Sequence, residues 1–167
     1  VGGDSLAWQI REARMDDSIS AVVLRIDSPG GSMFASQVIN DELDELKAAD
    51  KPLIASMSSV AASGGYYIAM PADEIWASSS TITGSIGVGA LLPTVQRGLE
   101  QLGIHVDGFG TTKLAGQLRL DRPLGEDARR VLTASVEDAY RIFVSQVAAA
   151  RDLTAERADS IARGRVW

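Results

Sequence analysis

The sequence predicts an α/β domain with a mostly parallel sheet, and three observations support that fold class. Aliphatic and β-branched runs alternate along the chain with stretches whose apolar residues recur at helical spacing. The first of these runs, Ala21–Ile26, is almost uninterrupted, which is typical of a parallel strand covered on both faces. Glycine and other small residues follow two of the runs directly, so the predicted strands end in tight loops.

The first half of the chain predicts two helices that alternate with two strands. A helix over Asp4–Arg14 begins at a capping aspartate, and its apolar residues lie three or four positions apart. The strand Ala21–Ile26 stops shortly before a proline and two glycines, which set a tight loop. Helical spacing resumes over Ala35–Leu46, and a strand over Leu53–Met57 then leads into the small residues Ser58–Gly65.

The second half continues the alternation of strands and helices. The elements predicted there are a short helix Tyr66–Met70, a strand Glu74–Ala77, a glycine-bearing segment Thr83–Val88, a helix Thr94–Leu102, a strand Ile104–Phe109, an amphipathic helix Leu132–Val147 and a last helix Thr154–Ala162. No internal repeat, low-complexity tract or linker interrupts this order, so we expect a single domain over residues 1–167. Because the sequence starts without methionine and stops at an apolar pair, we expect a fragment of a longer chain.

The composition excludes several classes of function. The 16 Lys and Arg residues against 22 Asp and Glu give a net charge of −6, which argues against nucleic acid as a partner. The chain contains no Cys and a single His, so thiol catalysis, disulfides and zinc sites of Cys or several His are excluded. A nucleophile here is therefore an oxygen, and we expect neither a metal nor an organic cofactor. No apolar run reaches the roughly 20 residues that span a bilayer, so any membrane anchor is expected outside this segment.

Ser63 is the candidate nucleophile. In open parallel sheets, ligands bind beyond the carboxyl ends of the strands, so the loops Ser28–Gly31 and Ala61–Gly65 are expected to share a cleft. Ser63 stands where the second loop becomes a helix, and there backbone N–H groups and the helix dipole face a developing negative charge. The G-x-S-x-G motif of many hydrolases is absent, however, and a tight turn between packed elements explains Ser-Gly-Gly equally well.

A serine nucleophile needs a base, and the chain offers few. His105 falls in a predicted strand, where a structural or surface histidine is the commoner case. Lys47 and Lys51 flank a helix end and are expected to be solvated. Lys113 follows a predicted strand directly, and a buried lysine that is neutral near the working pH serves as a base. A surface lysine in a loop is the commoner fate of such a residue, so both interpretations of Lys113 stay open.

Three segments resemble the signal peptide peptidase A (protease IV) family, which is peptidase family S49. These segments are Ile26–Ser32, Ser56–Ile68 and Thr81–Val88, and they occur in the family's order along essentially the whole chain. The sequence looks most like the C-terminal half of the long, two-repeat bacterial form, including the ending Ile161–Trp167. The family has the ClpP/crotonase-like fold, with repeated β-β-α units and flanking helices, so the resemblance agrees with the predicted α/β class.

Carried over residue by residue, the resemblance implies the catalytic roles. The nucleophile falls on Ser63, the backbone N–H groups of Gly31 and Gly64 become the oxyanion donors, and Ser85 becomes the hydroxyl that orients the basic lysine. Three further glycines shape the loops: Gly30, Gly65 and Gly84. A side chain at either donor glycine would obstruct the approach of a peptide carbonyl. The alternative that Gly84 and Ser85 only form a turn stays open.

The resemblance leaves the source of the lysine open. In short, single-repeat members the base lies in a Gly-x-x-Lys segment downstream of the serine, and Gly110–Lys113 fits that position. In the long form the base comes from the N-terminal half, which this sequence does not contain, and Leu114–Leu118 look more like the long form. The base is therefore either Lys113 or a lysine from another segment, and in the second case this fragment alone would be inactive.

The resemblance also implies the biological role. Members are serine endopeptidases with a Ser/Lys dyad that degrade remnant signal peptides and other extended hydrophobic peptides. They form dome-like homo-oligomers anchored at the bacterial cytoplasmic membrane, with the catalytic domain on its outer face. Two other functions remain open: a crotonase-like acyl-CoA enzyme, against which the Ser-Gly-Gly context argues, and a non-catalytic half that binds peptides or builds the oligomer.

Overall fold

The computed structural model describes residues 2–167, and this part of the chain divides into two compact units. The first unit consists of the residues up to Gly87 together with Tyr140–Trp167, and the second unit is Val88–Ala139. Helix α5 (Glu126–Ala150) contributes residues to both. That the whole chain folds as a single domain stays a prediction.

A parallel sheet lies at the centre of the first unit. Its strands are β1 (Val22–Ser28), β2 (Leu53–Ala62), β3 (Glu74–Trp76) and β4 (Ile82–Gly84). Strand β1 pairs with one edge of β2, while β3 pairs with the first part of β2 and β4 with its last part, all in parallel. The α/β class with a mostly parallel sheet is therefore confirmed.

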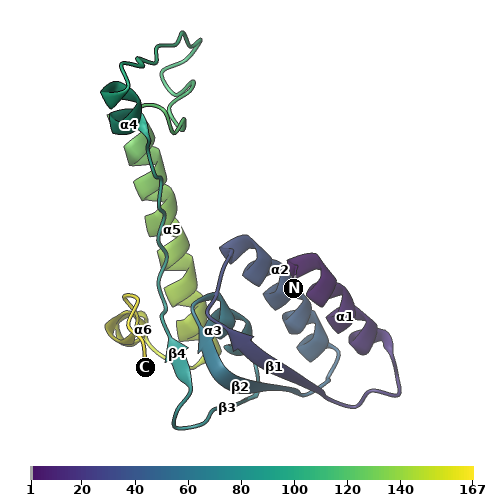
Figure 1. Cartoon of the computed structure of the whole chain (residues 1–167). Helices are drawn as coiled ribbons and strands as arrows, with labels where there is room; N and C mark the ends of the chain where they lie inside the picture. Colours follow the sequence, from purple (N-terminus) through teal and green to yellow (C-terminus); the bar gives the residue numbers. More distant parts are fainter. Residues whose placement is uncertain (1) are drawn as a thin grey trace. The chain divides into compact units, whose positions relative to one another are not determined.

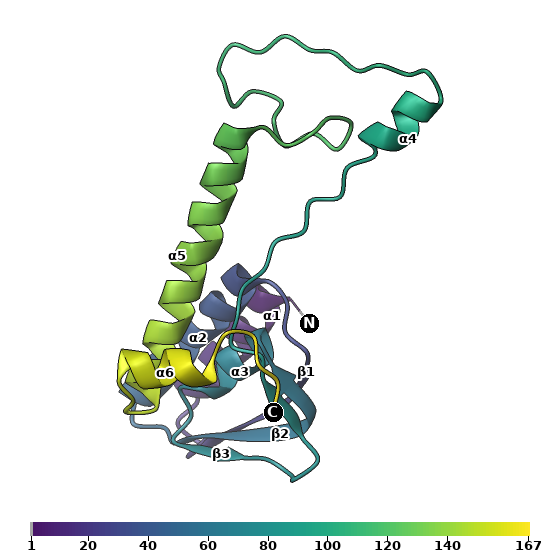
Figure 2. The same cartoon turned by 90° about the vertical axis from the view of Figure 1, so that its left-hand side faces the viewer.

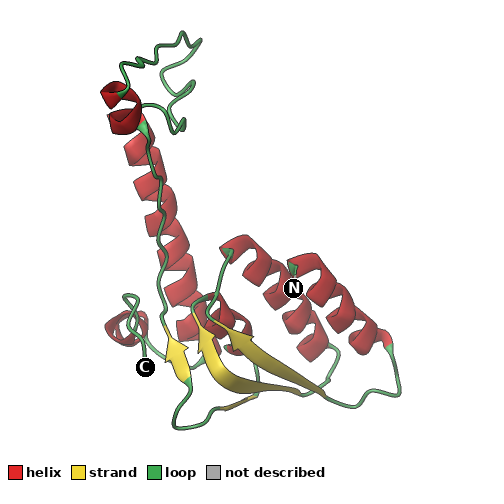
Figure 3. Ribbon diagram, in the orientation of Figure 1, coloured by secondary structure: helices red, strands yellow, loops and turns green. Residues whose placement is uncertain are grey.

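Two long helices cover one face of this sheet. Helices α1 (Gly3–Met15) and α2 (Met33–Ala48) lie side by side above β1 and β2, as Figures 1 and 3 show. In β1, Leu24 and Ile26 point into this core and are buried, whereas Val23 between them is 63% exposed. The prediction of a strand covered on both faces is thus wrong for this chain: the alternation of burial along β1 is that of a sheet with one covered face.

Buried charge links the two long helices. The Glu42 carboxylate of α2 is nearly inaccessible and accepts hydrogen bonds from Arg11 at 2.7 Å and Arg14 at 3.1 Å, both on α1. The hydrogen bond from Arg11 is the main reason why the pKa of Glu42 lies below its ordinary value. A buried carboxylate is stable only when it is paired in this way, so the ion pairs fix how α1 meets α2.

The remaining helices of the first unit follow the sheet. Helix α3 (Gly64–Ala69) leaves the end of β2, and α6 (Ala155–Ile161) follows α5 near the end of the chain. Thr154 caps α6 by accepting a hydrogen bond from the Arg157 N–H at 3.2 Å. After α6 the last residues return to the strands, as Figure 2 shows, and Val166 forms an antiparallel bridge with Gly84.

The second unit contains α4 (Gln96–Gln101), the first part of α5 and long loops. The predicted strand Ile104–Phe109 is wrong, because these residues form no strand in the structure. They have no partner strand and their apolar side chains lack cover, with Phe109 fully exposed at 100%. Helix α5 begins at Glu126, six residues before the predicted Leu132, in a turn whose two acidic residues suit a helix N-terminus.

Candidate active site

Ser63 stands on a strained turn between β2 and α3. Its backbone has φ +52° and ψ −119°, a region that residues with a side chain rarely occupy. Its N–H donates to the Gly84 carbonyl at 2.8 Å, and its own carbonyl accepts from the Tyr67 N–H at 2.9 Å. The side chain does not cap α3. The hydroxyl therefore lies at the start of the helix without a hydrogen bond to the helix backbone. This is the arrangement of a nucleophile on a sharp strand-to-helix turn.

The glycine loop after β1 lies directly against this turn. A Cβ atom on Gly30 would lie 2.7 Å from the Ser63 Cβ and 2.8 Å from the Gly64 nitrogen, and φ at Gly30 is +110°. A Cβ on Gly64 would lie 3.2 Å from the Gly31 nitrogen. Only glycine permits such a close approach of the two backbones. The structure thus brings together Ser63 and both predicted donor glycines, Gly31 and Gly64.

The two donor amides are free. Within residues 2–167, neither the Gly31 N–H nor the Gly64 N–H donates a hydrogen bond. Gly64 is the first residue of α3, so its N–H is one of those that no carbonyl of the same helix satisfies. Free backbone amides next to a serine are the groups that stabilise an oxyanion when a carbonyl is attacked.

An apolar groove reaches these amides. It has a volume of about 580 Å³, is lined by Gly31 and Gly64 at the site, and continues along Leu24 and Ile26 of β1 toward Leu6 of α1. Apolar walls beside a few convergent polar groups are the usual make-up of a ligand site. The groove is suited to hydrophobic side chains of an extended ligand.

Ser85 and Gly84 lie on the other side of the Ser63 turn. Ser85 has φ +48° and is half-buried, and Gly84 before it has φ +78°. The Gly84 carbonyl is the acceptor of the Ser63 N–H, so Ser85 follows the hydrogen-bond partner of the candidate nucleophile. Gly65 has a different place: a Cβ there would lie 2.5 Å from the Ser28 carbonyl, so α3 packs tightly on the end of β1.

The lysines differ sharply in their surroundings. Lys47 Nζ donates to the Pro71 carbonyl at 2.6 Å, and Lys51 Nζ donates to the carbonyl of Asp16 at 2.7 Å. Lys47 Nζ also forms an ion pair with Asp73 at 3.1 Å, and both lysines stay partly exposed, in keeping with the expectation for a helix end. Lys113 lies in an exposed loop of the second unit and makes no hydrogen bond or ion pair with any residue from 2 to 167. Its role as the base stays a prediction.

His105 also lies in the second unit. It occupies an exposed loop and not the predicted strand, because the segment from Ile104 to Phe109 has no strand partner. Residues 2–167 contain no cluster of three or more acidic or histidine side chains that could hold a metal ion. No helix within those residues is long and apolar enough to cross a membrane.

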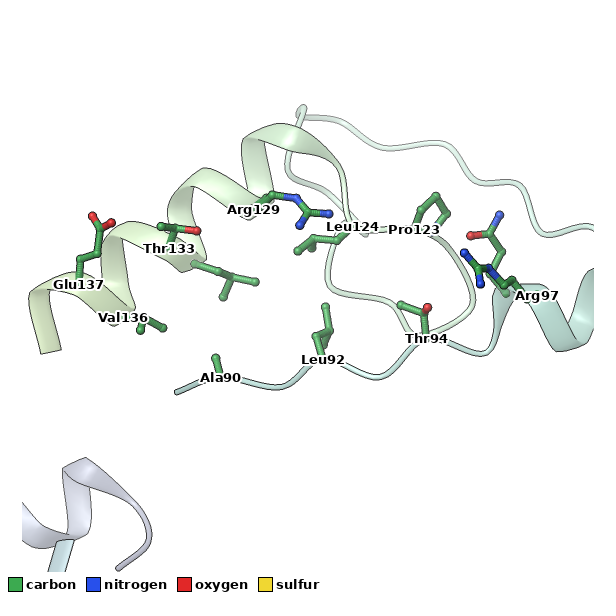
Figure 4. A pocket seen from close by; sticks show the side chains of 12 residues that line it. Ala90, Leu92, Thr94, Arg97, Pro123, Leu124, Arg129, Thr133, Val136 and Glu137 are labelled. Atoms are coloured by element: carbon green, nitrogen blue, oxygen red, sulfur yellow. The ribbon is translucent and has the colours of Figure 1, made fainter. Parts of the chain in front are cut away.

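The larger pocket of the molecule belongs to the second unit and contains none of the predicted site residues. It has a volume of about 750 Å³, and Figure 4 shows Leu92, Leu124 and Val136 on its walls, with Glu137 and Arg97 toward its two ends. Size alone does not make it the reaction site, since it lacks a serine, a lysine or a free pair of backbone donors aimed at one point.

Sequence reasoning missed several residues that hold the site in place. The Ser28 hydroxyl accepts a hydrogen bond from the Gly30 N–H at 3.2 Å, which fixes the glycine loop. Ser36 is buried on α2, and its Oγ lies 2.7 Å from where a Cβ of Gly64 would be. A serine directly before Pro-Gly-Gly was the sequence signal available for the contact of Ser28 with Gly30. The contact of Ser36 with Gly64 had no such signal, because it depends on how α2 packs against α3.

Similarity to known proteins agrees with this geometry. The chain resembles a ClpP1 mutant from Listeria monocytogenes with a TM-score of 0.58 and 15% identity, over 96% of this chain and 72% of that one. The fold is therefore ClpP-like, which confirms the predicted class.

The family model that matches is that of peptidase family S49, over residues 45–167, and the chain belongs to this family. Protease 4 of Salmonella typhi is 47% identical over 167 residues, which are all of this chain and 27% of that protein. The chloroplastic serine protease SPPA of Arabidopsis thaliana is 39% identical over 98% of this chain and 24% of its own length. A putative signal peptide peptidase SppA of Enterococcus faecium is 31% identical over 95% of this chain and 46% of its own length. The chain thus spans about a quarter to a half of the length of these relatives.

Proposed function

We propose that this chain is the serine-bearing part of an endopeptidase in which Ser63 attacks the peptide carbonyl. The observation that carries the proposal is the strained Ser63 turn packed against the Gly30–Gly31 loop, with two free backbone amides beside the serine. The Gly31 and Gly64 N–H groups would bind the oxyanion as it forms, and water would then release the acyl group. Membership of peptidase family S49 supports the same reaction class.

We infer that the base is a lysine. Lys47 and Lys51 are held by backbone carbonyls as hydrogen-bond donors, which leaves Lys113 or a lysine outside this chain. In this proposal the neutral lysine takes the Ser63 proton, and Ser85 orients the amine. The backbone conformations at Gly30 and Gly84, together with the close packing of Gly65, keep the loops that carry these groups in place.

The proposed substrates are extended hydrophobic peptides, in particular signal peptides after their release. The groove that leads from Gly31 and Gly64 toward the partly exposed Leu6 and Ile68 supports this substrate class, because an extended chain would place apolar side chains in it. The printed names of the Salmonella and Enterococcus relatives, a protease 4 and a putative signal peptide peptidase, point the same way. We place the protein at the outer face of the bacterial cytoplasmic membrane, held by an anchor outside this chain.

The proposed partner is a second copy of the same chain. The support for this proposal is that nine large apolar side chains of the second unit are exposed, since a partner surface would remove them from water. These side chains are Leu91, Val95, Leu102, Ile104, Phe109, Leu114, Leu118, Leu120 and Val131. A homo-oligomer would cover them.

The test is covalent labelling and peptide cleavage with the full-length protein. A serine-directed phosphonate should label the wild type, Ser63→Ala should abolish both labelling and cleavage, and Ser59→Ala on the exposed face of β2 should behave as the wild type. Labelling that persists in Ser63→Ala rejects the proposal. Turnover of acyl-CoA without peptide cleavage would instead make the protein a crotonase-like acyl-CoA enzyme. Retained cleavage by Lys113→Ala assigns the base to a lysine outside this chain.

A further inference from the structure

The last residues of the chain form a strap beside the Ser63 turn. The strap is Gly164–Trp167, and four backbone hydrogen bonds join it to the segment from Thr83 to Ile86. Thr83 and Trp167 exchange two of them, at 2.8 and 3.0 Å, the Ser85 N–H donates to Arg165 at 2.6 Å, and the Gly164 N–H donates to Ile86 at 2.9 Å. Strand β4 therefore lies between the end of β2 and the strap (Figure 1).

The segment that the strap holds is the one that holds Ser63. Gly84 lies at the middle of this pairing, opposite Val166, and its carbonyl accepts the Ser63 N–H at 2.8 Å. A Cβ on Gly84 would lie 2.6 Å from Cδ1 of the Trp167 indole, so the ring packs directly on this glycine. A shift of the strap would therefore reach Ser63 through the Gly84 carbonyl.

Three left-handed backbone conformations along this path need support from outside. The φ angles are +52° at Ser63, +78° at Gly84 and +48° at Ser85. Two of these residues are serines, for which the conformation is unfavourable unless the surroundings fix it. Without the strap, the amides of Thr83 and Ser85 would lose their partners, and only the pairing of β4 with β2 would hold the Gly84 carbonyl against Ser63.

Hydrogen bonds hold the residue directly before the strap. Arg163, just before it, donates its backbone N–H to the Tyr140 hydroxyl at 3.2 Å and its guanidinium to Asp159 at 3.0 Å. The Tyr140 hydroxyl in turn donates to Asp159 at 2.7 Å. At Gly164 the chain has φ +70°, and a Cβ there would meet nothing within 4 Å. The direction of the strap is thus set at its start by the backbone conformation at Gly164 and at its end by the packing of the Trp167 ring on Gly84.

We propose that the strap Gly164–Trp167 is a positioning element that holds the Ser63 hydroxyl in its reactive orientation, acting through Gly84. The inference rests on the proposed peptidase function of Ser63. The strap contacts no substrate; it fixes the turn so that the hydroxyl and the oxyanion donors stay aligned. A misplacement of about 1 Å at reacting groups costs on the order of 100-fold in rate, so a loosened strap should slow the reaction of Ser63 without removing it.

The experiment compares two matched glycine substitutions in the full-length protein. Gly164 has φ +70° and Gly103 in the second unit has φ +72°, and a Cβ at either position meets nothing within 4 Å. Gly164→Val and Gly103→Val therefore impose similar backbone strain, but only the first redirects the strap. The rate of phosphonate labelling at Ser63 should fall about 10- to 100-fold in Gly164→Val and stay within about twofold in Gly103→Val.

The readout separates positioning from folding. If the strap positions Ser63, Gly164→Val lowers kcat for a peptide with KM unchanged, and the final fraction of folded protein that is labelled equals that of the wild type. A wild-type labelling rate in Gly164→Val, or a lower labelled fraction at an unchanged rate, overturns the inference.

A second set of variants keeps the test decisive if Gly164→Val does not fold. Trp167→Ala should slow labelling and Trp167→Phe should restore it, whereas Trp76→Ala on β3, where the indole is similarly exposed, should label as the wild type does. Equal rates in all three reject the strap as a positioning element. A wild type that is not labelled at all rejects the proposed function itself, so the two failures are distinguishable.

Discussion

The two compact units differ in how far their apolar side chains are buried. In the first unit, buried aliphatic side chains from β1, β2, α1 and α2 form one continuous core that includes Leu43, Leu46 and Leu53. In the second unit, among the described residues, Ala128 is the only buried hydrophobic residue, while nine large apolar side chains are exposed. The first unit thus has a core of its own, whereas the described residues of the second unit form no comparable buried cluster.

This difference matches the distribution of the candidate site. Ser63, Gly31, Gly64 and Ser85 all belong to the first unit, where a packed core and backbone hydrogen bonds fix their geometry. Lys113 belongs to the second unit and lies in an exposed loop. A packed core therefore lies under the candidate nucleophile and oxyanion donors, whereas the candidate base lies among residues that this chain leaves exposed.

The largest effect that tests this comparison comes from a pair of leucines. Leu43 on α2 is 0% exposed and Leu91 in the second unit is 91% exposed. Leu43→Ala should lower the free energy of unfolding by about 2–5 kcal/mol, because it leaves a cavity in the core, whereas Leu91→Ala should change it by less than about 0.5 kcal/mol. Urea unfolding of this chain measures both. Similar losses in the two variants would show that the second unit buries its own apolar residues.

The Leu91→Ala variant also tests the proposed homo-oligomer. If a second copy covers the second unit, Leu91→Ala weakens association although it leaves the stability of the isolated chain unchanged. Sedimentation of the full-length protein over a range of concentrations measures this effect.

A smaller effect concerns the charge buried in the first unit. The pKa of Glu42 is lowered in the folded chain by Arg11 first and also by Arg14. A carboxyl whose folded pKa lies below its unfolded value stabilises the fold fully above the unfolded value, near 4.5, and this contribution is lost as the pH falls through the folded pKa. Glu42→Gln should therefore cost about 1–2 kcal/mol at pH 7 and less at pH 3. Chemical unfolding at both pH values measures the difference.

The control for Glu42 lies on the same helix. Glu45→Gln removes one negative charge from the exposed face of α2 and should leave stability at pH 7 within about 0.5 kcal/mol of the wild type. An equal cost for Glu42→Gln at pH 7 and pH 3 would mean that Arg11 and Arg14 do not stabilise the fold through the Glu42 charge.

Local signals in the sequence predicted the elements of the first unit well. The aliphatic run before Pro-Gly-Gly located the end of β1 to within two residues, because chain-breaking residues act on their own neighbours. The end of β2 was wrong: the strand continues past the predicted Met57 to Ala62, where small residues pair with β4. The same loops gave the close approach of Gly30 and Gly64, since parallel strands carry their carboxyl ends to one edge of the sheet.

What failed were the features that depend on distant partners. The residues from Ile104 to Phe109 have strand-like composition, but a strand exists only beside another strand and none lies next to them. The pairing of the strap with Thr83–Ile86 joins residues about eighty positions apart, and no local pattern at Gly164 specifies that partner. The same reason explains why the sequence does not identify the base: no local pattern around Lys113 specifies the environment that would make its amine neutral.

The smallest predicted effect is a gain of stability in the second unit. Gly98 lies within α4, is exposed, and a Cβ there would meet nothing within 4 Å. Gly98→Ala should therefore stabilise α4 by about 0.5–1 kcal/mol, because alanine loses less backbone entropy in a helix than glycine. The packed helix α3 offers no such gain, since a Cβ on Gly65 would lie 2.5 Å from the Ser28 carbonyl. Amide hydrogen exchange across α4 measures the change in this isolated chain, and slower exchange is expected. Unchanged exchange in the chain alone would mean that α4 is held by packing and not by its own helix propensity, which would contradict the contrast between the two units.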